Sequence, residues 1–265
     1  PEKRDFFLRD TDIFQFGRIG GGAGNFGDIN NTAVSAASKQ SGRPFFSRKI
    51  GLNSSGRPVD INYGGKLSGR IGRWDVGALS IQQDRDAKTD PTTITVIRAA
   101  ANILAESAIG FFASSGDPIS NQENQVLGLD ARLVNTRLSG GKILRADAWY
   151  LHADTEAIES DESAYGFSFE MPNPEGWRAG MRFKEIQENY LPALGFVDRK
   201  GVRDHNATLG YRYRFPTGFL QSLYSGIDAQ RIDLISGGLQ SQQVKFRLVE
   251  LDSRLEDQFI VHYWK

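Results

Sequence analysis

The feature that most constrains this chain is a one-residue alternation of apolar and polar side chains, which recurs along most of its 265 residues. In GWRAGMRFKEI, residues 176–186, the aromatic residues Trp177 and Phe183 alternate with the basic residues Arg182 and Lys184. Successive side chains of a β-strand point to opposite faces of the sheet. The pattern therefore predicts strands with one apolar face and one polar, largely basic face.

The same alternation recurs in six further segments: residues 63–71, 97–103, 127–133, 165–169, 208–215 and 244–248. The stretch 74–83 changes phase near Gly77, which predicts a β-bulge at that point. We expect about twelve strands between Val59 and Trp264, many of them near the ~10 residues that a tilted membrane strand needs.

The breaks between these segments are alternately short and long. The short breaks are residues 72–73, 105–106, 139–141, 172–175 and 216–218, and the long polar ones are residues 84–91, 115–124, 154–163, 187–205 and 231–243. Outer-membrane barrels have short turns on one side and long loops on the other, whereas a soluble sandwich shows no such regularity. The sequence therefore predicts an all-β fold, a transmembrane antiparallel β-barrel of the outer-membrane type with at least about twelve strands. A soluble β protein is the alternative.

Aromatic side chains gather near the strand ends, as the interfacial girdles of a membrane barrel require. The expected girdle residues are Trp74, Trp149, Trp177, Phe215, Tyr263 and Trp264. This pattern predicts a place in the outer membrane of a Gram-negative bacterium, where the outer wall contacts membrane lipid and lipopolysaccharide.

The polar faces of the predicted strands are rich in cations. They hold Lys66, Arg70, Arg98, Arg132, Arg145, Arg178, Arg182, Lys184, Arg212, Arg214, Lys245 and Arg247. The acids assigned to the same faces are Asp130, Asp147 and Glu170. A cation facing lipid near the bilayer midplane costs roughly 2–4 kcal/mol, so these faces are expected to line the interior. A basic interior attracts anions, and a salt-bridged interior filled by a plug is the other interpretation.

The chain divides into an N-terminal extended or loop segment, residues 1–52, which leads into or plugs the barrel, and the barrel strands, residues 53–265. A short helix is possible at residues 31–39 (NTAVSAASK). The chain opens on PEKRDFF without a leader, and its last strand runs outward if the short turns are periplasmic. We therefore expect a piece of a longer protein, with a complete barrel of about 14–18 strands.

Several motifs occur in a fixed order from Pro1 past His205. They are PEKRDFFLRDTDIFQFG, PFFSRKIG, GGKLSGRIGRWDVGALSIQ, TTITVIRAAANILAESAIG and YLPALGFVDRKGVRDHN. This set resembles the family called domain of unknown function 5916. The resemblance implies a bacterial outer-membrane β-barrel preceded by a periplasmic domain similar to carbohydrate-binding module family nine. The family has no settled activity, and the chain shows no motif that supports the "hydrolase" label of some members.

The sequence gives little support to catalysis or cofactor binding. The net charge is zero, so nothing in the bulk charge favours nucleic acid, and no cysteine is present for a disulfide, a thiolate metal site or a nucleophile. GAGNFG, residues 22–27, has the glycines of a dinucleotide loop but no acidic residue ~20 positions later. His152, His205 and His262 lie on separate segments, and no G-x-S-x-G elbow occurs. We expect no cofactor.

An acidic cluster in one long loop is the weak candidate for a calcium site. It consists of Asp154, Glu156, Glu159 and Asp161, with Glu162 beside them. Carboxylates at this density bind Ca²⁺ in some loops, but the spacing does not fit an EF-hand. A solvated surface loop, or contact with divalent-bridged lipopolysaccharide, is the alternative.

Two classes of function stay open. The first is a pore or transporter with a basic lumen for anionic or carbohydrate solutes. The second is a structural or anchoring barrel with a plugged lumen, which holds a periplasmic or surface protein partner. An outer-membrane hydrolase is a third interpretation, and it needs Ser, His and Asp side chains that converge at one barrel rim.

Overall fold

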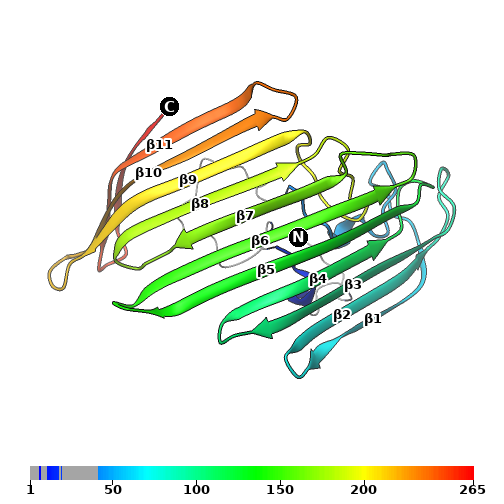
Figure 1. The fold of residues 1–265 in the computed structure, drawn as a ribbon, viewed down its shortest axis with the longest axis horizontal. Helices are drawn as coiled ribbons and strands as arrows, with labels where there is room; N and C mark the ends of the chain where they lie inside the picture. The colour runs from blue at the N-terminus through cyan, green and yellow to red at the C-terminus, as the bar shows by residue number, and fades with distance from the viewer. Residues whose placement is uncertain (1–5, 7–10, 18, 20–40) are drawn as a thin grey trace.

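Twelve antiparallel strands form one sheet, in which each strand pairs with its neighbours in the sequence (Figure 1). The computed structural model describes residues 6, 11–17, 19 and 41–265. The strands are β1 (Ile61–Ile71), β2 (Trp74–Gln83), β3 (Thr92–Ile103), β4 (Ser107–Ser115), β5 (Asn124–Leu138), β6 (Lys142–Thr155), β7 (Ser163–Met171), β8 (Gly176–Ile186), β9 (Val202–Arg214), β10 (Leu220–Leu234), β11 (Leu239–Ser253) and β12 (Gln258–Trp264). The predicted all-β fold and its strand number are confirmed.

Two short 3-10 helices precede the sheet, η1 (Thr11–Phe14) and η2 (Ser47–Lys49). Among the described residues, no helix is long and apolar enough to cross a membrane.

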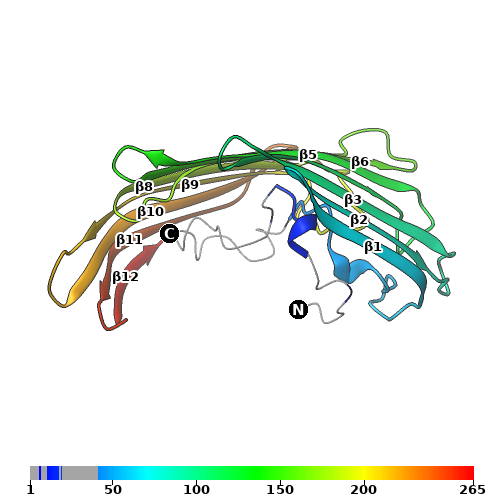
Figure 2. The same cartoon turned by 90° about the horizontal axis from the view of Figure 1, so that it is seen from below.

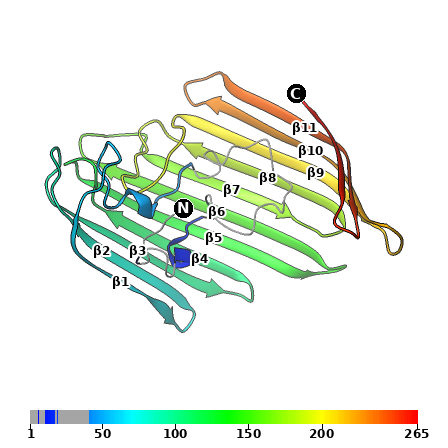
Figure 3. The same cartoon turned by 180° about the vertical axis from the view of Figure 1, so that it is seen from behind.

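The sheet is bent into a trough, with β1 and β12 as its two edges on opposite sides (Figure 2). Within the part of the chain that the structure describes, β1 pairs with β2 alone and β12 with β11 alone. The described N-terminal segment, residues 11–19 without 18 and residues 41–60, lies on the concave side of the trough. Figure 3, seen from behind, shows η1 and η2 lying across the strands of one half of the sheet.

The one-residue alternation of the sequence sorts side chains onto the two faces of this sheet. Directly paired residues of an antiparallel sheet share a face. Arg98, Phe112, Gly128 and Leu151 are successive partners from β3 to β6, and they point to the concave face. The intervening residues, such as Leu129 with 62 % of its surface exposed, form the convex face. The convex face is therefore largely apolar and open to its surroundings.

The bulge predicted near Gly77 is wrong. The register of β2 with β3 is continuous from Trp74 to Gln83, and its pairing with β1 shifts only between Ile61 and Tyr63. The apparent change of phase has another cause. Leu79 and Ile81, each 2 % exposed, point to the concave face, where the N-terminal segment covers them.

An apolar core fills the concave side of the trough toward the long loops. It joins the N-terminal segment, the strands β2 to β8 and the loop after β8. Phe14 contacts Phe45 with ring centroids 5.7 Å apart, and Phe16 meets Phe112 edge-on at 5.8 Å. Burying each of these rings stabilises the fold by roughly 1.5–3 kcal/mol.

The connections alternate between short turns and longer loops with one exception. The break predicted at residues 231–243 is wrong, because β10 and β11 continue through most of it and leave only residues 235–238 between them. Gly237 and Gly238 take positive φ angles of 105° and 96°, which side chains with a Cβ rarely adopt. This glycine pair makes a tight turn where the polarity of the sequence suggested a loop.

Candidate functional site

The concave face of the sheet is the candidate functional site, because it collects the charged side chains of the strands. The register places all of the predicted interior cations on this face: Lys66, Arg70, Arg98, Arg132, Arg145, Arg178, Arg182, Lys184, Arg212, Arg214, Lys245 and Arg247. For example, Lys66 is paired with the buried Leu79, and Arg182 with Ser168.

The interior is less basic than the sequence suggested, because further acids share this face. They are Asp75, Asp204, Asp228, Glu250 and Asp252, in addition to the predicted Asp130, Asp147 and Glu170. Asp204 accepts hydrogen bonds from the amides of Asn206 (2.8 Å) and Gln230 (2.9 Å). Arg70 pairs with Asp75 at 2.6 Å. Much of the basic row therefore has neighbouring counter-charges.

A β-bulge in β11 explains why some of these additional acids lie on the concave face. Tyr224 and Gly226, two residues apart on β10, pair with Glu250 and Arg247, three residues apart on β11. The extra residue shifts the alternation, so Arg247 and Glu250 both point to the concave face. Their side chains form an ion pair of 3.5 Å.

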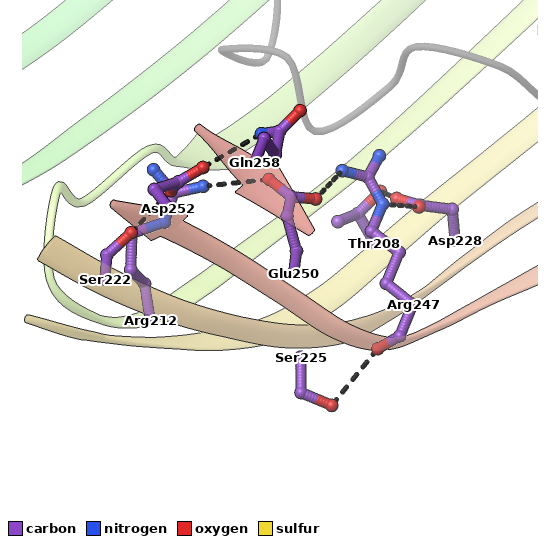
Figure 4. Close-up of polar contacts among 9 residues, drawn as sticks. All are labelled: Thr208, Arg212, Ser222, Ser225, Asp228, Arg247, Glu250, Asp252 and Gln258. Carbon is purple, nitrogen blue, oxygen red and sulfur yellow. Dashed lines mark hydrogen bonds and ion pairs between the residues drawn. The ribbon is translucent and has the colours of Figure 1, made fainter. Parts of the chain in front are cut away.

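Arg247 is the centre of a buried ionic cluster on β9, β10 and β11 (Figure 4). Its Nε donates to Asp228 Oδ2 at 2.7 Å, and the side chains are only 5 % and 6 % exposed. Asp228 also accepts a hydrogen bond of 2.8 Å from the Thr208 hydroxyl. On the other side, Arg212 Nη2 lies 3.5 Å from Glu250. Each acid of this cluster is thus held between a cation and a second partner.

Tyr224 forms the floor of the same cluster. The guanidinium carbons of Arg178, Arg212 and Arg247 lie 5.7, 5.3 and 5.7 Å from its ring centroid. The phenol fits there because its neighbours on β9 and β10, Gly210 and Gly226, have no side chain; a Cβ on either would collide with its oxygen. Cations over an aromatic face are stabilised by the quadrupole of the ring, so these arginines are braced by packing.

Three of the predicted interior cations bind the N-terminal segment. Arg98 Nη1 pairs with Asp130 at 2.7 Å, and its Nε donates to the Gln15 carbonyl at 3.0 Å. Asp130 in turn accepts a hydrogen bond of 3.1 Å from the Gly17 amide. The Arg98–Asp130 pair therefore joins β3 and β5 to the N-terminal segment.

Two lysines make similar contacts elsewhere along the segment. Lys184, which is buried, donates from Nζ to the Ser41 carbonyl at 3.1 Å. Lys66 donates to the Phe6 carbonyl at 2.9 Å. Three cations that the sequence pattern assigns to the interior therefore hold backbone carbonyls of the N-terminal segment.

The loop after β8 covers the same end of the trough. Tyr190 is completely buried, and its hydroxyl donates to the Gly42 carbonyl at 3.4 Å. Burial raises the pKa of this phenol well above its usual range, so it stays neutral. The backbone of Phe46 donates to the Leu194 carbonyl at 2.7 Å, which ties the loop to the N-terminal segment.

The aromatic girdle is only partly as predicted. Trp177 stacks edge-on with Tyr211 at 5.3 Å, and Tyr263 lies 6.0 Å from Phe246, both on the convex face. Trp74 is 42 % exposed on the same face. Phe215, in the turn after β9, packs against Tyr213 at 5.0 Å.

Trp149 and Trp264 are wrong as girdle residues, because both point to the concave face. Trp149 shares its parity with Asp147 and packs against the N-terminal segment, so that a Cβ on Gly17 would collide with its ring. Trp264 is paired with Lys245, whose Nζ lies 4.5 Å from the indole centroid.

The candidate calcium ligands do not come together. The part of the chain that the structure describes has no group of three or more acidic, histidine or cysteine side chains that could hold a metal ion, which overturns the site at Asp154, Glu156, Glu159 and Asp161. The loop uses its carboxylates locally: Glu162 accepts a hydrogen bond of 2.9 Å from the Thr155 amide. The motif at residues 22–27 and the possible helix at 31–39 lie outside the described residues.

The histidines are dispersed. His152 and His205 lie on the convex face, and His262 on the concave face beside Arg247. This spacing offers no common site for the three.

Comparisons with protein-family models, curated proteins and solved structures found no match to this chain. The resemblance to domain of unknown function 5916 therefore stays a prediction.

Proposed function

We propose that this chain forms the wall of an outer-membrane β-barrel whose interior is occupied by its own N-terminal segment, and that it serves as an anchoring barrel. The observation that carries the proposal is the apolar core between this segment and the concave face of β2 to β8. A water-filled passage needs a polar lining, whereas Phe14, Phe16 and Phe45 fill this half of the trough with hydrocarbon.

The convex face supports the membrane part of the proposal. Large apolar side chains are widely exposed there, including Leu129, Trp177 and Leu209 at 62 %, 60 % and 49 %. A contiguous apolar surface on this scale is costly in water but matches the outer band of a membrane barrel. In lipid the backbone groups of β1 and β12 also need partners, so the proposal requires these edges to pair with each other or with further strands.

Transport of anionic or carbohydrate solutes is the second candidate. It is favoured by the polar concave face of β8 to β11, where Arg178 and Arg212 lie near one another on neighbouring strands and Arg182 follows further along β8. In this version the N-terminal segment restricts one half of the interior, and the solute passes along the other half.

Conductance in planar lipid bilayers separates the two candidates. An anchoring barrel inserts but gives no steady current, and Phe16→Ala combined with Phe45→Ala produces current by loosening the plug. Leu129→Ala combined with Phe111→Ala, on the convex face, is the matched control and leaves the bilayer silent. A steady anion-selective current from the unmodified protein, lowered by Arg182→Glu with Arg212→Glu, favours transport instead. Failure to insert overturns both.

A further inference from the structure

The convex face has a hollow over its C-terminal strands. A groove of about 620 Å³ runs over the outer side of β7 to β11. Its floor is a single cross-strand row of small side chains, in which Ala207 of β9 is paired with Ala229 of β10. Met181 on β8 and Val244 on β11 continue this row on either side. The hollow exists because two methyl groups stand where neighbouring rows have large side chains.

The end of the groove toward the long loops carries charged side chains of both signs, two arginines beside a histidine and two carboxylates. His205 and Arg231, which line it, are direct partners on β9 and β10. Arg203 lies one step further along the convex face of β9, where its Nε bonds Glu185 at 2.6 Å. Arg231 pairs with Asp233 at 2.9 Å. The two guanidinium side chains are 46 % and 57 % exposed, so they are accessible to a ligand despite these partners.

An arginine presents five N–H donors in a planar fork, which matches the oxygens of a phosphate. Glu185 accepts the Nε–H of Arg203, and Asp233 accepts hydrogen bonds from Nε and Nη2 of Arg231. The other N–H groups of each guanidinium are not used by these carboxylates. A phosphate at this end would thus meet two guanidinium groups and an imidazole while the carboxylates keep their own bonds. The groove thus combines an apolar channel with a guanidinium and an imidazole at one end, and Arg203 lies just beyond them.

We infer that this groove holds an acyl chain of an anionic membrane lipid, with the lipid phosphate at Arg203, His205 and Arg231. The inference rests on the proposed membrane insertion and adds a specific ligand to the outer wall. The acyl chain lies over Ala207 and Ala229 and packs against Met181 and Phe183. The phosphate lies at the end of the groove toward the long loops, where the apolar band gives way to charged side chains.

The test compares lipid retention by variants of the inserted protein. The protein is reconstituted in vesicles of phosphatidylcholine with a minority of phosphatidylglycerol, extracted in mild detergent, and analysed by native mass spectrometry. The unmodified protein is expected to retain one phosphatidylglycerol. Ala229→Phe fills the groove and lowers this occupancy about tenfold or more, because the chain loses its contact surface. Ala113→Phe, on the convex face of β4 away from the groove, is the matched control and retains the lipid.

The charge contribution has its own variant. Arg203→Gln combined with Arg231→Gln abolishes the preference for phosphatidylglycerol over phosphatidylcholine, but one lipid molecule stays bound. Equal retention by the unmodified protein and Ala229→Phe in inserted samples overturns the lipid site and leaves the proposed barrel intact. Loss of a dimer, with no change in bound lipid, also overturns it and assigns the groove to a second copy. Failure to insert overturns the proposed function and the inference together.

Discussion

At the scale of single residues, glycines decide where the charged side chains of the concave face can lie. Gly110 is opposite Asp130 and beside Arg98, and a Cβ added there would collide with the guanidinium. Gly65, on the convex face of β1, has open space around the same position. Gly110 leaves room for the ion pair between Arg98 and Asp130, whereas Gly65 has no neighbouring atom that needs the space.

Gly110→Ala is therefore expected to destabilise the fold by about 1–3 kcal/mol, since the ends of the Arg98 and Asp130 side chains have to move and their hydrogen bond is weakened. Gly65→Ala is the control, and unfolding of both variants by denaturant in the same detergent gives the comparison. Equal stability of the two variants would contradict the packing seen around Arg98.

Ion pairs on the concave face also differ in burial. Arg247 and Asp228 are almost fully covered, whereas the Arg70 side chain paired with Asp75 is 67 % exposed. Arg247→Leu strands the buried carboxylate of Asp228 and is expected to lower the free energy of unfolding by about 3–5 kcal/mol. Arg70→Leu, measured by the same denaturation, should change it little because water solvates both partners.

At the scale of elements, the sequence predicted strands well and the exceptions have local causes. The alternation identified the face of each interior cation because parity survives wherever a strand is regular. It missed Glu250 because the bulge in β11 reverses parity between residues 247 and 250. It missed Asp228 because none of the alternating segments identified in the sequence covers β10, residues 220–234.

The girdle and the N-terminal segment show a different limit. Trp149 has the parity of an interior residue, which was a usable signal, but proximity to a strand end suggested a girdle instead. No local pattern could reveal that Phe14 and Phe16 fill the trough, since their partners are about 65 to 135 residues away in β2 to β6. Long-range burial is the part of this structure that alternation does not encode.

The contact between the N-terminal segment and the sheet can be measured as a coupling. Phe16→Ala and Phe112→Ala are each expected to cost about 3–5 kcal/mol, because each opens a cavity in the core. The double variant should fall short of the sum by about 0.5–1.5 kcal/mol, which is the value of the ring pair. Additive effects in this double-mutant cycle would show that the two rings do not touch.

At the scale of the whole molecule, the two faces of the sheet have opposite environments. The convex face is apolar between its charged margins, and the concave face is divided into an apolar half under the N-terminal segment and an ionic part on β8 to β12. This division is what the proposed plugged barrel needs. The apolar convex face contacts lipid, and the N-terminal segment keeps water away from the apolar half of the concave face.

The chain contains no cysteine, so single cysteines report the environment of each face without interference. In reconstituted vesicles, Leu129→Cys on the convex face is expected to resist a water-soluble maleimide, because lipid covers it. Glu256→Cys, in the turn between β11 and β12, should react rapidly when that side of the membrane is accessible. Rapid labelling of Leu129→Cys in an inserted, folded sample would place the convex face in water.

The position of the N-terminal segment also couples its docking to the shape of the sheet. The segment is covalently continuous with β1 and lies in the concavity that β2 to β8 surround (Figure 2). The apolar core joins its aromatic rings to side chains of seven successive strands, so the full core exists only when these strands are curved toward the segment. Docking of the segment therefore favours the curvature of this part of the sheet, and the curved sheet in turn holds the segment in place.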